Sequence, residues 1–156
     1  MIAAHLRELV RSRAGDACEY CRLPQRALPF APFHIDHVIP QQHHGATESD
    51  NLALACDRCN AYKGTNLAAI DPATRQQVAL FNPRTHIWTE HFRMNGARIE
   101  GRTDVGRATA DLLKMNADRH VALRHALIQT PSSDPAGARC PLTSIQSARG
   151  GAIRGR

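Results

Sequence analysis

Two short motifs of the same form, CEYC at residues 18–21 and CDRC at residues 56–59, enclose the segment that decides the fold of this chain. A CxxC turn places both of its thiolates on one side of a tight knuckle, and two facing knuckles can complete a tetrahedron around one metal ion. The alternatives are thioredoxin-like redox chemistry, which needs only one CxxC in a βαβ context, and a pair of unrelated knuckles. Two matched pairs favour a closed, structural zinc site. Its expected ligands are Cys18, Cys21, Cys56 and Cys59.

The overall composition indicates one compact, basic domain. The chain has 156 residues, with 20 Lys and Arg against 14 Asp and Glu and a formal net charge of +6. Such a protein attracts polyanions such as nucleic acid, although many small proteins are mildly basic. No apolar run approaches the roughly 18 residues that cross a bilayer, so we expect no membrane partner and a cytoplasmic location. In that reducing compartment paired cysteines favour metal binding over disulfides, whereas Cys140 stands alone and is expected to bind nothing.

Hydrophobic spacing predicts the elements around the two cysteine pairs. Apolar residues within residues 2–10 recur on one helical face, and Gly15 is a natural stop for that N-terminal helix. Residues 33–39 are a short β-rich run closed by a proline, and residues 52–55 can form a second short strand. A helix is expected to begin at Asp57 or at the next residue. The core elements therefore follow in the order strand, strand, helix.

The C-terminal half predicts a hairpin followed by a helix. An alternating run over residues 88–94 leads to an Asn-Gly dipeptide at residues 95–96. Asn-Gly suits a two-residue type I′ turn, because both central residues of that turn need positive φ. The return strand is expected at residues 97–100. One long helix is then expected from residue 103 or 104 to about residue 128, supported by charge pairs at i, i+4.

These elements predict an α+β protein with one domain over residues 1–130, made of a core at about residues 15–66 and an extension over residues 67–130. Residues 131–156 are rich in Pro, Gly, Ser and Ala, and their four Arg against one Asp supply +3 of the net charge. Such a segment buries too little apolar surface to offset its ordering entropy. We therefore expect a disordered basic tail.

A group of polar residues lies between and beside the cysteine pairs. The stretch HIDHVIP spans residues 34–40, DNLAL follows at residues 50–54, and NAYKG spans residues 60–64. Over about residues 15–66 this ensemble resembles the HNH family, which belongs to the wider ββα-metal (His-Me finger) nucleases. An Asp-His pair alone would be read as a surface dipeptide. The order DH…N…N in register with two zinc knuckles is a highly specific signature of the family.

The resemblance implies a role for each matching residue. Asp36 matches the acid that binds the catalytic metal ion, and Asn60 occupies the position of the second metal ligand. His37 matches the general base that deprotonates the attacking water, and Asn51 matches the residue that braces the loop through hydrogen bonds to backbone. Lys63 matches a basic residue common after the second ligand and is expected to contact phosphate. The other expected substrate contacts are Arg58 and His34.

The chemistry of phosphodiester hydrolysis agrees with these implied roles. A hard divalent cation held by a carboxylate oxygen and an amide oxygen can neutralise the charge that develops on the phosphate and on the leaving oxygen. A histidine, with a reference pKa of about 6.5, is suited to take a proton from water at neutral pH. One catalytic ion is implied, with Mg²⁺ preferred over Mn²⁺ or Ni²⁺, because Gly64 stands where some relatives carry a further histidine.

Two features of the implied site stay open at the level of sequence. Adjacent residues of an ideal strand point to opposite faces, so we expect a local distortion at the end of the strand that lets Asp36 and His37 face one ion, as in the family. His34 stands where relatives often carry Glu. It could assist the metal ion or orient phosphate, and a role in strand packing explains it equally well.

The leading hypothesis is a metal-dependent DNA endonuclease whose fold is stabilised by a structural zinc ion. The alternative is a zinc-ribbon module that binds nucleic acid without catalysis, and a third hypothesis is an RNA-directed nuclease or a toxin-like effector. Contacts to the phosphate backbone carry no sequence information, and no helix has a clear base-reading pattern. We therefore expect weak specificity, or a protein partner that supplies it.

Overall fold

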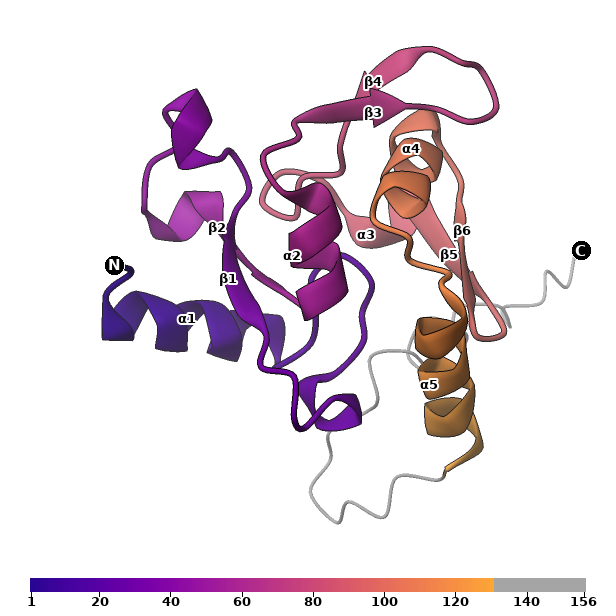
Figure 1. Ribbon diagram of the computed structural model, residues 1–156, viewed down its shortest axis with the longest axis horizontal. Coiled ribbons are helices and arrows are strands. Elements are labelled where there is room, and N and C mark those ends of the chain that lie inside the picture. The colour runs from indigo at the N-terminus through magenta and orange to yellow at the C-terminus, as the bar shows by residue number, and fades with distance from the viewer. Residues whose placement is uncertain (131–156) are drawn as a thin grey trace, which may run out of the picture.

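The computed structural model describes residues 1–130 of the chain (Figure 1). The predicted basic tail over residues 131–156, which includes Cys140, lies outside the described residues. In Figure 1 the N-terminal helix and the first two strands lie on one side, and the later hairpins and helices lie on the other. This mixture of helices with three separate two-stranded sheets confirms the predicted α+β class.

The core of the fold is a strand–strand–helix unit. It consists of β1 (His34–His37), β2 (Leu52–Ala55) and α2 (Asp57–Lys63). The two strands are antiparallel and pair residue for residue along their full length. All four residues of β2 are buried, because one face packs under α1 (Ala4–Ala14) and the other under α2. The loop between the strands contains two short 3-10 turns, Gln41–His43 and Ser49–Asn51, and a third, Gln25–Ala27, precedes β1.

Helix α1 ends where its sequence predicts. Gly15 follows it with a φ of +58°, in the left-handed region that glycine occupies without a Cβ penalty. The backbone N–H of Gly15 donates to the carbonyl of Ser12 at 3.1 Å, and the next N–H donates to the carbonyl of Arg11 at 3.1 Å. Val10, a residue of α1, is fully buried and packs the helix against the core.

The extension, residues 67–130, follows this unit in the chain and packs against it. Its elements are β3 (Ala68–Ile70), β4 (Gln77–Ala79), α3 (Trp88–His91), β5 (Phe92–Asn95), β6 (Arg98–Gly101), α4 (Asp104–Leu112) and α5 (Asp118–Gln129). Strands β3 and β4 pair with each other, as do β5 and β6. Gly106 of α4 sits against the end of α3 so closely that a Cβ there would lie 2.0 Å from the His91 carbonyl oxygen. None of the helices in residues 1–130 is both long and apolar enough to cross a membrane.

Three predicted details of the extension are wrong. Trp88 lies in a short helix rather than in the strand, which begins only at Phe92. The central residues of the hairpin turn are Gly96 and Ala97, because Asn95 pairs with Arg98 across the hairpin. Only Gly96 in this turn has positive φ, at +56°.

The predicted long helix is also wrong, because it is divided into α4 and α5. Tertiary hydrogen bonds hold the segment between them open. The Asn116 side chain accepts from the Ile99 N–H at 2.8 Å and donates to the Ile99 carbonyl at 2.7 Å. The buried guanidinium of Arg124 donates to the Met115 carbonyl. Lys114 takes a φ of +48°, which no α-helix permits.

Candidate active site and metal centre

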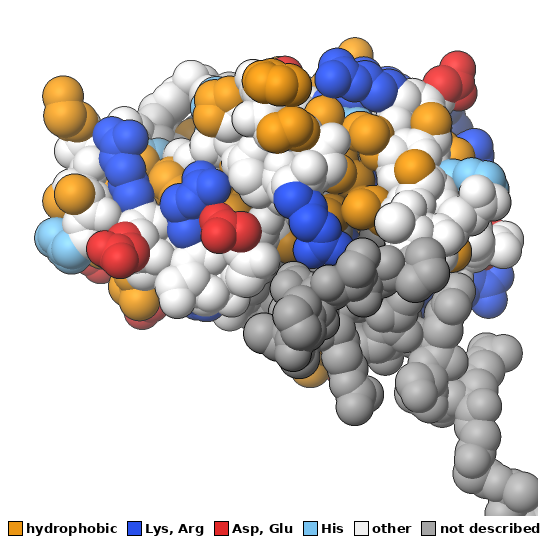
Figure 2. Space-filling model, turned by 90° about the horizontal axis from the view of Figure 1, so that it is seen from below, with side chains coloured by type: hydrophobic (Ala, Val, Ile, Leu, Met, Phe, Trp, Pro, Cys, Tyr) orange, Lys and Arg blue, Asp and Glu red, His pale blue; other side chains and the backbone are white. Residues whose placement is uncertain are grey.

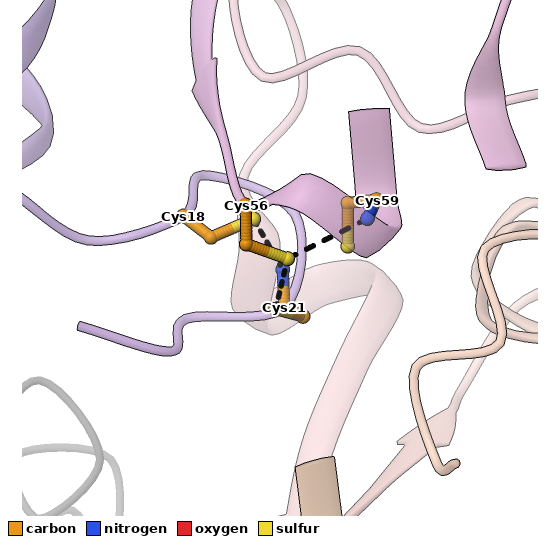
Figure 3. A group of neighbouring side chains, drawn as sticks. All are labelled: Cys18, Cys21, Cys56 and Cys59. Atoms are coloured by element: carbon orange, nitrogen blue, oxygen red, sulfur yellow. Dashed lines mark hydrogen bonds between the residues drawn. The ribbon is translucent and has the colours of Figure 1, made fainter. Parts of the chain in front are cut away.

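The four predicted cysteine ligands converge on one point (Figure 3). Their Sγ atoms all lie within 4.8 Å of one another, and all four residues are buried. The Sγ atoms of Cys21 and Cys56 are 3.7 Å apart. A tetrahedral zinc ion with Zn–S bonds of about 2.3 Å requires sulfur atoms about 3.8 Å apart, so the cluster has the size of a zinc site. Clustering of the predicted ligands is confirmed.

The two knuckles of this cluster have matching geometry. The N–H of Cys21 donates to Cys18 Sγ at 3.5 Å, and the N–H of Cys59 donates to Cys56 Sγ at 3.5 Å. Hydrogen bonds from the neighbouring thiols, first that of Cys18, lower the pKa of Cys21 well below its usual range, whereas those from Cys18 and Cys21 raise the pKa of Cys56 and of Cys59. Ionising one thiol therefore opposes ionising the next. A divalent cation removes this opposition, and all four thiolates can then form.

The first knuckle is held in place by residues of the extension. The Glu19 carboxylate accepts the Leu54 N–H at 2.8 Å and also pairs with the guanidinium of Arg84. The indole N–H of Trp88 donates to the Tyr20 carbonyl at 2.7 Å. The cysteine cluster therefore joins the core to residues more than sixty positions later in the chain.

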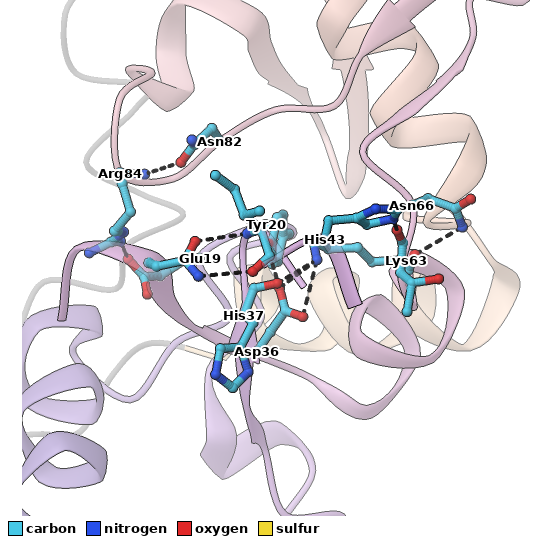
Figure 4. A network of polar contacts seen from close by, with 12 residues as sticks. Glu19, Tyr20, Asp36, His37, His43, Lys63, Asn66, Asn82 and Arg84 are labelled. Carbon is cyan, nitrogen blue, oxygen red and sulfur yellow. Dashed lines mark hydrogen bonds and ion pairs between the residues drawn. The ribbon is translucent and has the colours of Figure 1, made fainter. Parts of the chain in front are cut away.

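Asp36 is buried on β1 and is held by two other elements (Figure 4). Its Oδ2 accepts the Tyr20 hydroxyl at 2.7 Å, and the Lys63 ammonium lies 3.2 Å from Oδ1 and 3.1 Å from Oδ2. Burial raises the pKa of Asp36, and the charge of Lys63 and the hydrogen bond from Tyr20 oppose that rise. Burial also raises the pKa of Tyr20 well above its usual range, so its phenol keeps the proton that it donates. Asp36 is thus an internal, fully partnered carboxylate.

His37 has a different environment from its neighbour. Its Nε2 lies 2.9 Å from Thr47 Oγ1 in the loop between the strands, and its carbonyl accepts the Lys63 ammonium at 2.9 Å. In Figure 4 the imidazole points away from that ammonium. The expected distortion of β1 is absent, because every residue of β1 keeps its register opposite β2 and none has positive φ. The Asp36 carboxylate contacts Tyr20 and Lys63, whereas the His37 ring contacts Thr47, so the two neighbouring side chains have separate partners.

Asn51 ties together the loop that follows β1. Its Oδ1 accepts the Ile39 N–H at 2.8 Å, and its Nδ2 donates to the carbonyls of Ile39 and Ala46, both at 2.9 Å. Gly45 allows this packing, because a Cβ there would lie 1.7 Å from the Ile39 carbonyl oxygen. These bonds hold the loop through its backbone, the role that the HNH resemblance implies for Asn51.

Asn60 and His34 line a depression of about 340 Å³ between β1, α1 and α2. Arg7 and Arg11 of α1 also line it. His34 Nε2 lies 3.4 Å from Asp57 Oδ1, at the start of α2. Among the described residues no hydrogen bond joins Asn60 to Asp36, so the two residues expected to share a metal ion are not drawn together by direct contact.

The two other expected substrate contacts lie on opposite sides of α2. Lys63 is only 1% exposed, and its ammonium pairs with Asp36. A direct contact with phosphate would require the Lys63 side chain to leave this position. Arg58 packs its guanidinium over the Tyr62 ring, 5.5 Å from the centroid. Sequence reasoning missed Tyr20 and Thr47 as partners of the predicted catalytic pair. Tyr20 could have been suspected from its place inside the first knuckle, whereas nothing in the polar loop singles out Thr47.

The fold and this site define a ββα unit joined to a buried cluster of four cysteines. A family model described as "HNH endonuclease" matches residues 18–66, and this segment is an HNH endonuclease domain. The chain is also similar to "Septu protein PtuB" of Bacillus thuringiensis, with 25% identity over 121 residues. That match covers 75% of this chain and 43% of the relative, so the chain spans less than half of the relative's length. No solved structure matches the chain.

Proposed function

We propose that this chain is a metal-dependent endonuclease that hydrolyses phosphodiester bonds in DNA. The observation that carries the proposal is the match of residues 18–66 to an HNH endonuclease model, and within that segment Lys63 forms a bridge, with its Nζ 3.2 Å from Asp36 Oδ1 and 2.9 Å from the His37 carbonyl oxygen. This bridge holds α2, which bears Asn60, against the two residues of β1 that the HNH resemblance assigns to catalysis. We place the protein in the cytoplasm, where free thiols persist and can bind zinc.

The donor set of the proposed catalytic ion is a carboxylate oxygen of Asp36 and the amide oxygen of Asn60. Hard oxygen donors with open positions for water suit Mg²⁺, and the four buried thiolates suit zinc. When bound, the hard cation supplies charge stabilisation to the phosphate. The Lys63 ammonium already contacts both Asp36 oxygens, so a cation bound there would lie close to a second positive charge.

His37 is proposed as the general base. Thr47 Oγ1 contacts its Nε2 at 2.9 Å and fixes the orientation of the ring. Among the described residues Nδ1 makes no hydrogen bond, so a ring nitrogen is free to accept the proton of an attacking water once the tautomer permits it. Proton transfer of this kind contributes a factor of about 10² to 10⁴ to the rate of many enzymes.

The test is cleavage of supercoiled plasmid by the purified chain with Mg²⁺, Mn²⁺ or neither. We expect nicking that needs metal and falls at least about a hundredfold in His37→Ala. His43→Ala is the matched control, because His43 lies in the loop that follows β1 and its ring makes one hydrogen bond among the described residues, to the Thr65 carbonyl at 3.1 Å. Equal rates for the parent and His37→Ala would reject the proposal. A labelled RNA of the same length run in parallel separates DNA from RNA as substrate.

A second candidate is a zinc-containing module that binds nucleic acid without cutting it. The contacts of Asp36 with Lys63 and Tyr20 favour it, because that buried carboxylate already has a counter-charge and a hydrogen-bond donor within the protein. Plasmid binding with no cleavage under any metal condition would support this candidate. A protein partner that directs the nuclease to its target is a further part of our proposal, and plasmid cleavage that appears only with such a partner would support it.

A further inference from the structure

Basic side chains do not form one continuous patch on the face shown in Figure 2. They occur there in separate small groups among hydrophobic and uncharged side chains. On this face a polyanion would therefore be held at a few defined places rather than along a broad basic surface. Residues of α2, β6 and α4 line a depression of about 570 Å³. This volume lies within the range of about 300 to 1,000 Å³ that is usual for pockets of small ligands.

Two arginines in this depression have no acidic partner among the described residues. Arg58 of α2 and Arg98 of β6 line it and form no ion pair there. The Nε of Arg58 is buried without a hydrogen-bond partner. Arg107, which also lines the depression, differs because Asp71 holds it through bonds of 2.9 and 2.6 Å. Lys114 and Asp111 also line the depression and pair with each other at 3.5 Å, which leaves Arg58 and Arg98 as its arginines available to an anionic ligand.

An aromatic ring lies beside these charges. Tyr62 lines the same depression and is 45% exposed, a large exposure for an aromatic side chain on a helix that packs into the core. The guanidinium of Arg58 sits 5.5 Å from the centre of its ring. An aromatic ring paired with an arginine offers a flat stacking surface beside a charge, the combination by which proteins hold a base and its phosphate.

We propose that this depression binds a nucleotide of single-stranded nucleic acid, with its base against Tyr62 and its phosphate between Arg58 and Arg98. The nucleic-acid identity of the ligand rests on the proposed function. Arg58 and Tyr62 stand at i, i+4 on α2, whereas Asn60 and Lys63 face the other way, toward β1. The depression and the proposed catalytic residues are therefore separated by one helix, about 10 Å across. A strand of the substrate that is opened or displaced at the cut site can reach it.

The test measures binding of a fluorescent 12-nucleotide single strand and of a duplex of the same sequence, by anisotropy, in the His37→Ala background without added Mg²⁺. We expect Tyr62→Leu to weaken single-strand binding about tenfold through the loss of stacking. The Arg58→Gln/Arg98→Gln variant should weaken it further and lower the slope of log affinity against log salt by about 1.4, since each lost contact to a single strand contributes about 0.7. Duplex binding should change less.

Arg93→Gln is the matched control, because Arg93 lies on the neighbouring strand, is exposed and pairs with Glu100. It should leave the salt slope unchanged. Single-strand binding that is equal in the parent, in Tyr62→Leu and in Arg58→Gln/Arg98→Gln would overturn the proposal, as would full competition by a millimolar polyglutamate peptide. Loss of binding in the pocket variants, together with a parent that cuts no plasmid, would keep this site and reject the nuclease activity.

Discussion

The Nζ atom of Lys63 lies 3.1 Å from Oδ2 and 3.2 Å from Oδ1 of Asp36, and both residues are buried. A lysine at the end of α2 thus serves as the counter-charge of a carboxylate in the middle of β1. Burying two charges costs several kcal/mol per ion, which only close pairing and further hydrogen bonds can offset. Tyr20 and the His37 carbonyl supply those further bonds.

Removing the ammonium should be costly. Lys63→Met leaves Asp36 as a buried charge without a cation, so we expect the free energy of unfolding to fall by about 3 to 5 kcal/mol in urea titrations. The double variant Asp36→Asn/Lys63→Met should regain part of this loss, because no unpaired charge remains. Lys114→Met is the control, since its pair with Asp111 is exposed and should change stability by less than about 1 kcal/mol. Equal losses of unfolding free energy in Lys63→Met and Lys114→Met would show that the buried Lys63–Asp36 pair stabilises the fold no more than an exposed pair does.

The cysteine cluster should hold one zinc ion per chain. We expect Cys56→Ser to lose the metal and to unfold, because the same sulfur also caps α2 and metal binding is coupled to folding. Metal content by mass spectrometry and helicity by circular dichroism measure the two effects. Cys140→Ser should retain full zinc content, and loss of zinc in that variant would contradict the assigned ligand set.

Acid should destabilise the fold through His120. Burial, together with the charges of Arg58 and Arg124, lowers the pKa of His120 to about 4 in the folded chain, against about 6.5 when unfolded. Between these values the unfolded chain binds more protons, so the free energy of unfolding falls as pH falls from about 6.5 to 4, by up to about 3 kcal/mol. The difference in stability between His120→Gln and the parent should shift with pH over this window.

His125→Gln is the control for that experiment, because His125 lies on the same helix and is exposed. Its unfolding free energy should follow that of the parent at every pH. If His120→Gln also follows the parent, the acid sensitivity belongs to other groups.

The hydrogen bonds by which Asn51 holds the loop after β1 should depend on Gly45. A Cβ at Gly45 would lie 1.7 Å from the Ile39 carbonyl oxygen and 2.8 Å from Asn51 Nδ2, so Gly45→Ala must displace the loop. We expect a loss of about 1 to 3 kcal/mol in thermal or urea unfolding, together with reduced plasmid cleavage. Because both residues act on the same loop, Gly45→Ala and Asn51→Ala should be non-additive in a double-mutant cycle. Full additivity would mean that the two do not share this contact.

Much of the fold followed from local spacing. The two CxxC pairs, the Gly15 stop of α1 and the order strand, strand, helix are properties of short segments, and the structure agrees with each. The division of the predicted long helix was not visible in this way. Helical propensity continues through residues 113–117, and only the distant contacts of Asn116 and Arg124 hold that segment open.

The candidate site, too, was predicted from the sequence only in part. The residue types and their order established the HNH domain and the zinc-like cysteine cluster, because ligand chemistry and turn geometry are set within a few residues. Tertiary structure alone decided that Lys63 is the buried partner of Asp36 and that Thr47 contacts His37. It also decided that two arginines beside Tyr62 have no ion-pair partner within residues 1–130. The pairing of charges depends on distance and burial in three dimensions, and residues far apart in the chain come within reach of one another only after folding.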